Sequence, residues 1–160
     1  MAKTHGLSVG VRAFLKAYPW RTIDPVPVSV LRKPLSQCRL ALISSAGLVV
    51  RGDIPFDSSV RGGDFSYRVI PRNADLQSLE EHHISDSFDH SGIETDRNLA
   101  LPLDRAHELA GAGVVAEVAP NHISLMGSIT APGRLTRHTA PQVSKLLLAD
   151  QVDIALLVPV

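Results

Sequence analysis

Short apolar runs separated by polar, glycine-rich and proline-rich stretches dominate the pattern of the chain. Residues 39–46 (RLALISSA) form one such run just ahead of Gly47, which predicts a buried strand. The final stretch, residues 152–160 (VDIALLVPV), is an almost continuous apolar run, typical of a strand covered on both faces. Three further strands are predicted at residues 67–70, 82–85 and 114–124.

Two stretches carry apolar residues at helical spacing. Pro102 is placed to open the first helix, in which apolar residues recur every three or four positions until glycines end it at residues 111–113. Thr139 is the expected N-cap of the second helix, with Pro141 in its first turn and Val143 on its apolar face.

The alternation of strands and helices predicts a three-layer α/β fold with a mostly parallel, doubly wound sheet. Residues 39–160 are expected to form this single domain, and residues 1–38 an N-terminal extension with a short amphipathic helix at residues 11–18. In doubly wound sheets, ligands bind beyond the carboxyl ends of the strands. The predicted binding loops therefore follow Ala46, Ser85 and Ser124.

Composition narrows the possible partners. Sixteen basic and sixteen acidic side chains cancel, so charge gives no reason to propose nucleic acid or an anionic membrane. No apolar run approaches the roughly 20 residues of a membrane span, and the N-terminus lacks the apolar core of a signal peptide. The single Cys38 excludes an internal disulfide framework. These features predict a cytoplasmic protein.

The densest polar cluster lies at residues 80–92 (EEHHISDSFDHSG). Histidine can act as an acid, a base or a metal ligand near neutral pH, and a neighbouring carboxylate fixes its tautomer. A functional interpretation places His83, Asp86, Asp89 and His90 around a pocket at the end of a strand. The alternative is a solvated loop in which both aspartates accept hydrogen bonds from backbone amides.

The same cluster suggests a metal-assisted hydrolase as a further, less favoured hypothesis. Its spacing is H-H-x-x-D-x-x-D-H, which matches neither H-E-x-x-H nor H-x-H-x-D-H. No resident metal is therefore predicted.

A second candidate lies in residues 44–57 (SSAGLVVRGDIPFD). The small residues Ser45, Ala46 and Gly47 at the end of a strand allow backbone amides to approach a carboxylate or phosphate closely. A tight turn after a core strand explains the same residues at least as well. Cys38 precedes that strand, so it is expected to lie away from the predicted binding edge rather than to act as a nucleophile.

Five segments together resemble the selenoprotein B family of glycine, sarcosine and betaine reductases and the related D-proline reductase subunit. They occur in the order found in that family and cover most of the chain from residue 33 onward. The segments are KPLSQCRLALISSAGLVVRGDIPFD (33–57), GDFSYRVIPR (63–72), HISDSFDHSG (83–92), NLALPLDRAHELAGAGVVAEVAPNHISLMG (98–127) and ADQVDIALLVPV (149–160).

The resemblance implies reductive cleavage of a carbon–nitrogen bond in a small amine or amino acid. In the family, a selenocysteine or cysteine attacks the substrate, working with sister subunits and a thioredoxin-like electron donor. Carried onto this chain, the resemblance assigns His83, Asp89 and His90 to catalysis, as groups that position substrate or move protons. It assigns a substrate-binding loop to Ser45, Ala46, Gly47 and Asp53.

The chain departs from the family after residue 160. In the relatives, the strand that resembles DIALLVPV leads into the redox motif with its Sec or Cys, and this sequence ends there. The expectation is a reading truncated at a Sec codon, and a remnant or one half of a split protein is the alternative. As written, the chain has no Sec/Cys redox centre. A non-catalytic ligand-binding or assembly subunit therefore stays open as a second function, and a homo-oligomer is possible.

Overall fold

The computed structural model describes residues 8–18, 22–85 and 90–160, and the chain divides into two units. The first unit, Met1–Val30, contains helix α1 (Val9–Ala17). Ser8 caps this helix, because its Oγ accepts a hydrogen bond from the Val11 amide at 3.3 Å. The amphipathic helix predicted at residues 11–18 is therefore present, shifted by about one residue at its end and two at its start.

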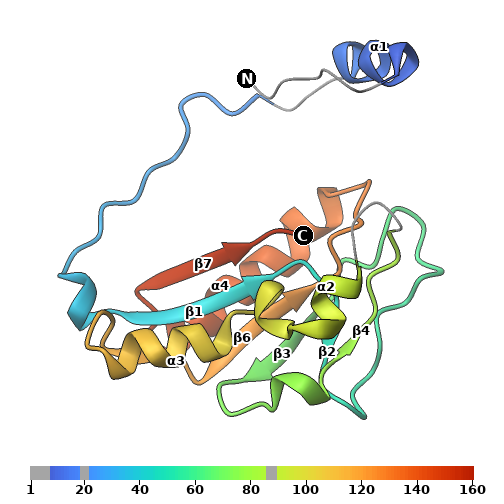
Figure 1. Cartoon of the computed structure of the whole chain (residues 1–160). Coiled ribbons are helices and arrows are strands. Elements are labelled where there is room, and N and C mark those ends of the chain that lie inside the picture. Colours follow the sequence, from blue (N-terminus) through green and yellow to red (C-terminus); the bar gives the residue numbers. More distant parts are fainter. Residues whose placement is uncertain (1–7, 19–21, 86–89) are drawn as a thin grey trace. The chain divides into compact units, whose positions relative to one another are not determined.

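The second unit, Leu31–Val160, is built on a five-stranded sheet (Figure 1). The central strand β1 (Arg39–Ser44) is parallel to β5 (Glu117–Val118) and β6 (Asn121–Leu125) on one side and to β7 (Ile154–Val158) on the other. Strand β3 (Tyr67–Pro71) adds to β6 in the antiparallel direction. The prediction of a mostly parallel sheet is confirmed.

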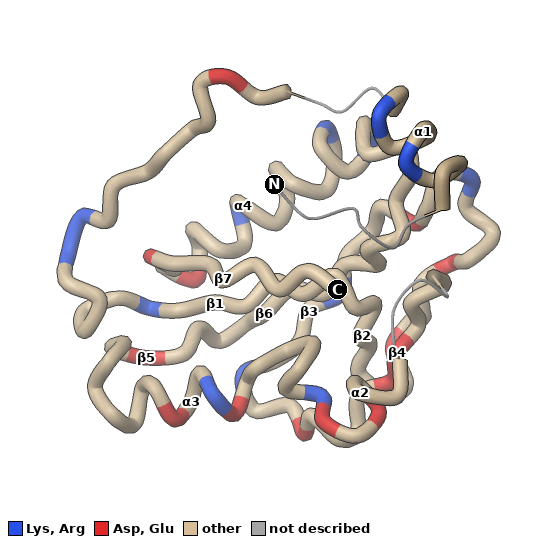
Figure 2. The backbone as a smooth tube through the Cα atoms, turned by 45° about the horizontal axis from the view of Figure 1, so that its top comes forward, with Lys and Arg blue, Asp and Glu red and all other residues tan. Residues whose placement is uncertain are grey.

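Helices lie on both faces of this sheet. Figure 2 shows α3 (Leu103–Gly111) and α4 (Ala140–Ala149) on opposite sides, which confirms the three-layer α/β fold. A short helix α2 (His90–Thr95) and a small antiparallel pair, β2 (Leu48–Val49) with β4 (Glu80–Glu81), lie beside the main sheet. Further short helical turns span Leu35–Gln37, Leu76–Ser78, Arg97–Leu99 and, as a π-helix, Leu135–Thr139.

The main hydrophobic core lies between the sheet and α3. Leu40 and Leu42 of β1 pack there with Ile70 of β3 and with Leu103 and Ala106 of α3, all at most 6% exposed. The helical spacing that opens after Pro102 thus supplies the inner face of the helix layer.

A buried histidine accepts a main-chain hydrogen bond from the central strand, where the neighbouring strands β5 and β6 are interrupted. Strands β5 and β6 both pair with β1, but Pro120 separates them and has no amide hydrogen to donate. The Leu42 amide in the middle of β1 donates instead to Nδ1 of His122 at 3.0 Å. His122 is fully buried, and that burial, with a smaller contribution from His107, lowers its pKa to about 4.

Several predicted elements differ in the structure. The stretch at residues 114–124 forms two strands because of Pro120, and the strand expected at 82–85 is instead β4, two residues earlier. The loop predicted after Ala46 includes the short strand β2. Thr139 is the N-cap residue of α4 as expected, but its side chain makes no capping hydrogen bond, because the π-helix continues through it and its hydroxyl donates to the Phe65 carbonyl.

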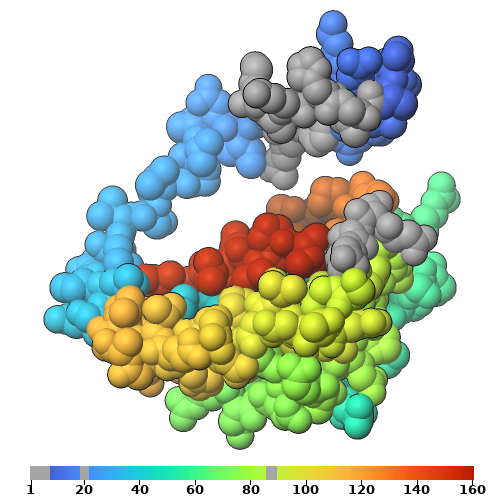
Figure 3. Space-filling view, in the orientation of Figure 1, coloured from blue at the N-terminus to red at the C-terminus, as the bar shows by residue number. Residues whose placement is uncertain are grey.

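The prediction that the last strand is covered on both faces is also wrong for the described residues. Leu156 and Leu157 of β7 are 46% and 67% exposed, and the red C-terminal residues are visible on the surface in Figure 3. An apolar run of this length is shared by buried strands and by edge strands, so the pattern alone did not separate them. None of the described helices has the length and apolarity to cross a membrane.

Replacing His122 by Asn tests whether His122 is buried as a neutral ring, through the pH dependence of stability. Asn keeps an acceptor for the Leu42 amide but does not titrate. The unfolded chain binds a proton at His122 near pH 6.5, whereas the folded chain resists it until about pH 4. The stabilisation is therefore complete above pH 6.5 and is lost progressively as the pH falls toward 4, by about 3 kcal/mol.

Urea unfolding at several pH values between 7.5 and 4.5 provides the measurement. The wild-type chain should lose stability with falling pH more steeply than His122→Asn, because all other groups titrate in both proteins. Parallel curves would show that His122 is not buried as a neutral ring.

Replacing Gly47 by Ala tests the close approach of its backbone to that of His83. Gly47 has φ 68°, and a Cβ there would lie 2.9 Å from the backbone nitrogen of His83. Gly113 is a matched control, since its φ is 71° but no atom lies within 4 Å of its Cβ position. Both substitutions bear the strain of a left-handed residue, of about 1 kcal/mol.

Only Gly47→Ala also has the steric clash, which should cost a further 1–3 kcal/mol or so in the free energy of unfolding. Urea denaturation of the two variants measures the difference. Equal losses in both variants would mean that the backbone around His83 yields freely.

Candidate functional site

The carboxyl ends of three parallel strands meet at one edge of the sheet. The Ser45 amide, just past β1, donates to the Val158 carbonyl of β7 at 3.1 Å. The Ser45 carbonyl accepts from the Gly127 amide, just past β6, at 2.8 Å, and Ala46 bridges Met126. The loops predicted after Ala46 and Ser124 therefore lie together, as the rule for doubly wound sheets requires.

Gly47 brings the segment of His82 and His83, which leads toward the third predicted loop, to the same edge. Its amide donates to the Leu125 carbonyl at 2.8 Å, and its carbonyl accepts from the His82 amide at 3.0 Å. The clash that a Cβ at Gly47 would make with His83 shows how closely the two segments approach. The segment of His82 and His83 thus lies beside the loops after Ala46 and Ser124, and residues 86–89 lie outside the described residues.

An ion-paired histidine lies in this third loop. Nδ1 of His90, at the start of α2, is 2.7 Å from Oε2 of Glu81, and its Nε2 is 2.8 Å from the Ser85 carbonyl. Both neighbours are hydrogen-bond acceptors, so the geometry is that of an imidazolium with a proton on each nitrogen. Only 10% of the Glu81 side chain is exposed, and solvent screens this pair less than a surface ion pair.

His83 lies beside this pair in a different protonation state. Its ring centroid is 6.4 Å from that of His90, and its Nδ1 accepts a hydrogen bond from the Ser85 amide at 3.2 Å. Burial is the main cause that lowers the pKa of His83, the charge of His90 adds to it, and Glu81 opposes it. His83 is therefore neutral near pH 7, with its proton on Nε2.

A small apolar cavity opens at the same edge. Its volume is about 140 Å³, and Ile43, Leu125 and Leu157 contribute to its lining together with Ser45. The Ser45 hydroxyl, which accepts a hydrogen bond from the Val160 amide at 3.0 Å, gives this lining a polar group. The cavity has room for a small molecule of a few heavy atoms only.

The structure does not bring every predicted site residue to this edge. Asp53 lies in an exposed turn, and no described contact joins its carboxylate to Ser45, Gly47 or the histidines. Asp86 and Asp89 fall outside the described residues. Among the residues that the structure describes, no group of three or more His, Cys, Asp or Glu side chains could hold a metal ion.

Cys38 is at the opposite end of β1, as expected. It is fully buried, and its thiol donates to the Pro34 carbonyl at 3.2 Å. Sequence reasoning missed Glu81 and Gly127 as parts of the site. Glu81 stands in the polar cluster that was recognised, but only the fold shows which of its carboxylates faces His90.

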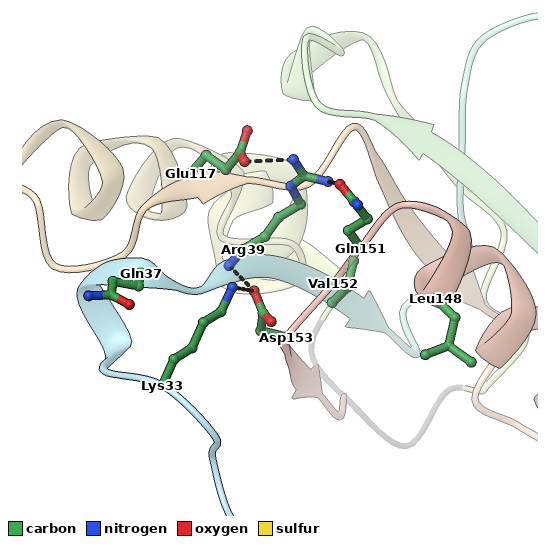
Figure 4. A pocket seen from close by; sticks show the side chains of 8 residues that line it. All are labelled: Lys33, Gln37, Arg39, Glu117, Leu148, Gln151, Val152 and Asp153. Atoms are coloured by element: carbon green, nitrogen blue, oxygen red, sulfur yellow. Dashed lines mark hydrogen bonds and ion pairs between the residues drawn. The ribbon is translucent and has the colours of Figure 1, made fainter.

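A larger cavity, of about 390 Å³, lies at the amino ends of the strands (Figure 4). Its charged groups are already paired: Lys33 with Asp153 at 2.8 Å and Arg39 with Glu117 at 2.7 Å. Hydrogen bonds from the Arg39 amide and then from Lys33 hold the pKa of Asp153 below its usual value. These contacts fasten β1 to β5 and β7, and we assign this cavity a structural role.

Comparison with known proteins identifies relatives of this chain. The model of the family described as glycine/sarcosine/betaine reductase selenoprotein B (GRDB) matches residues 9–159. The D-proline reductase subunit gamma of Acetoanaerobium sticklandii is 31% identical over 136 residues, which cover 84% of this chain and 54% of the relative. No solved structure matches the chain significantly.

Two other curated relatives are more distant. Sarcosine reductase complex component B subunit beta of Peptoclostridium acidaminophilum is 28% identical over 90% of this chain and 33% of its own length. Glycine reductase complex component B subunit gamma of Symbiobacterium thermophilum is 24% identical over 88% and 32%. The chain thus spans between a third and about half of these relatives. The resemblance in its five segments is confirmed, and the chain belongs to the glycine/sarcosine/betaine reductase selenoprotein B family.

Proposed function

We propose that the chain is part of a reductase complex that cleaves a carbon–nitrogen bond in a small amine or amino acid. Family membership supports the reaction class, since the relatives are named as reductases of D-proline, sarcosine and glycine. The observation that carries the proposal is the Glu81–His90 pair, held at the carboxyl edge of the sheet next to the loop of Ser45 and Gly47.

The residues of this edge suit one half of such a reaction. A Sec or Cys redox centre would supply the nucleophile that attacks the carbon bearing the nitrogen. The electron pair of the broken carbon–nitrogen bond stays on nitrogen, so a primary or secondary amine leaves readily only when its nitrogen carries a proton. His90 holds two protons, and Glu81 and the Ser85 carbonyl fix its orientation. We assign His90 as the proton donor to the departing nitrogen, and neutral His83 as a group that positions substrate.

Substrate size follows from the cavity beside Ser45. A volume of about 140 Å³ excludes most side chains and favours small substrates such as glycine, sarcosine, betaine or D-proline, which the names of the family and relatives suggest. The remaining subunits of the complex and a thioredoxin-like protein would deliver the redox centre and its electrons.

The placement of Cys38 favours a second candidate function. The only thiol of the 160 residues lies at the amino end of β1, away from Ser45 and the histidines. A subunit that binds or assembles but performs no chemistry would need no thiol at the carboxyl edge. Retention of full turnover by a complex whose His90 is replaced would favour this function.

Replacing His90 by Gln tests the proton donor in the reconstituted complex. Gln can still form hydrogen bonds but cannot act as a general acid, so turnover at pH 7 should fall by about 100-fold or more. The rate is measured as the amine released from glycine or sarcosine, or as the ring-opened amino acid formed from D-proline. His107→Gln is a matched control, because His107 of α3 also contacts a carbonyl, that of Arg72 at 2.8 Å, but lies outside the site.

The two histidine variants should unfold at the same denaturant concentration as the wild-type chain. A large loss of stability in His90→Gln alone would indicate a structural role for the pair. Absence of both amine release and ring opening with the wild-type complex would contradict the proposed reaction.

A further inference from the structure

The segment after β6 and the long loop after β2 meet, and together they carry three arginines. Arg61, Arg134 and Arg137 are called the arginine patch below. The two backbones that carry them touch: a Cβ at Gly63 would lie 2.6 Å from the Ser128 carbonyl oxygen, and one at Gly62 would lie 2.7 Å from Cβ of Ala131. The patch therefore stands on a closely packed base.

The central member of the patch is held in place. Nη2 of Arg134 donates to the Arg61 carbonyl at 2.6 Å, and its guanidinium lies 4.5 Å from the ring centroid of Phe65. The Phe65 carbonyl in turn accepts from the Thr139 hydroxyl. A cation fixed by stacking and hydrogen bonding loses little conformational entropy when it meets a partner.

Among the residues that the structure describes, no carboxylate neutralises the patch. No Asp or Glu occurs between Glu117 and Asp150. In the facing loop, Asp57 accepts from the Ser59 amide and hydroxyl, and the buried Asp64 accepts from the Asp57 and Ser66 amides. Within the described residues, none of the three arginines forms an ion pair.

Five other cations of this unit, unlike the three arginines of the patch, form ion pairs: Lys33, Arg39, Arg51, Arg68 and Arg105. Arg51 lies 3.4 Å from Glu80, and Arg105 lies 2.8 Å from Glu108. On a chain whose net charge is zero, the patch is thus a local concentration of positive charge.

We propose that the arginine patch is a docking surface for an acidic face of a partner protein. Three cations on a neutral chain are few for nucleic acid, for which proteins commonly neutralise about six to ten phosphates. The curated relatives are named as subunits, which makes a protein the expected partner; this part of the inference rests on the proposed function.

The segment that carries two of the arginines also contacts the candidate site. The segment that carries Arg134 and Arg137 begins at Gly127, whose amide donates to the Ser45 carbonyl. A partner bound to the patch would lie beside the candidate site. Electrostatic attraction there would speed association and set the orientation of the partner.

Poly-L-glutamate serves as a probe of the patch that does not depend on the proposed function. The double variant Arg61→Gln with Arg137→Gln removes two exposed charges whose side chains make no described hydrogen bond, so the fold should persist. Arg51→Gln with Arg105→Gln is the matched control, which removes two cations that are already paired. Fluorescence anisotropy with labelled poly-L-glutamate at 50 and 250 mM NaCl measures the affinity.

The patch variant should bind about ten-fold more weakly at low salt, and the control should stay within two-fold of wild type. Equal affinities of the two variants would overturn the inference. Tighter binding of wild type to a DNA duplex or to anionic lipid vesicles than to poly-L-glutamate would contradict the choice of an acidic protein.

Assembly with the remaining reductase subunits separates the inference from the proposed function. Size-exclusion chromatography should show wild type and control entering the complex, and the patch variant leaving it as salt rises. If the patch variant assembles like wild type, the inference fails and the proposed function stands. If wild type itself never assembles, the proposed function fails, and the poly-L-glutamate titration decides the inference alone.

Discussion

Two backbone hydrogen bonds of one glycine connect the main sheet to the loop that carries the histidines. The Gly47 amide donates to Leu125 of the main sheet, and the Gly47 carbonyl accepts from His82, just past the smaller sheet. The chain can make both bonds only because Gly47 adopts a positive φ and leaves no Cβ against His83. This turn, together with the pairing of β2 with β4, holds Glu81 and His83 beside the ends of β1 and β6.

The arrangement separates structural from chemical roles along the central strand. At the amino end of β1, Arg39 and its paired carboxylates fasten the neighbouring strands, and Cys38 is buried. In the middle, His122 satisfies the Leu42 amide as a neutral ring. At the carboxyl end, two histidines lie in different surroundings: burial lowers the pKa of His83, and His90 is paired to a carboxylate. Groups whose environments drive their protonation apart are typical of acid–base sites.

Much of this could be predicted from the sequence, because its signals are local. The apolar run at 39–46 and the helical spacing after Pro102 specify the central strand and one helix layer, and the order of elements specifies parallel pairing. The same order sends the loops after Ala46 and Ser124 to one edge. Other features depend on contacts between distant segments, which periodicity does not encode. These are the ion pair of Glu81, the hydrogen bond that His122 accepts from Leu42, and the close packing at Gly62 and Gly63. Asp53 was grouped with Gly47 by nearness in sequence, yet the turn at residues 51–53 carries it into solvent.

The central claim is that substrate binds at the carboxyl edge of the sheet, between the loop of Ser45 and Gly47 and the proton held by His90. Structure determination of the assembled complex with a small amino-acid substrate bound tests it most directly. The account predicts density for the ligand within hydrogen-bonding distance of Ser45 or His90. A ligand found instead among Lys33, Arg39 and Asp153 at the amino edge, or wholly on another subunit, would contradict it.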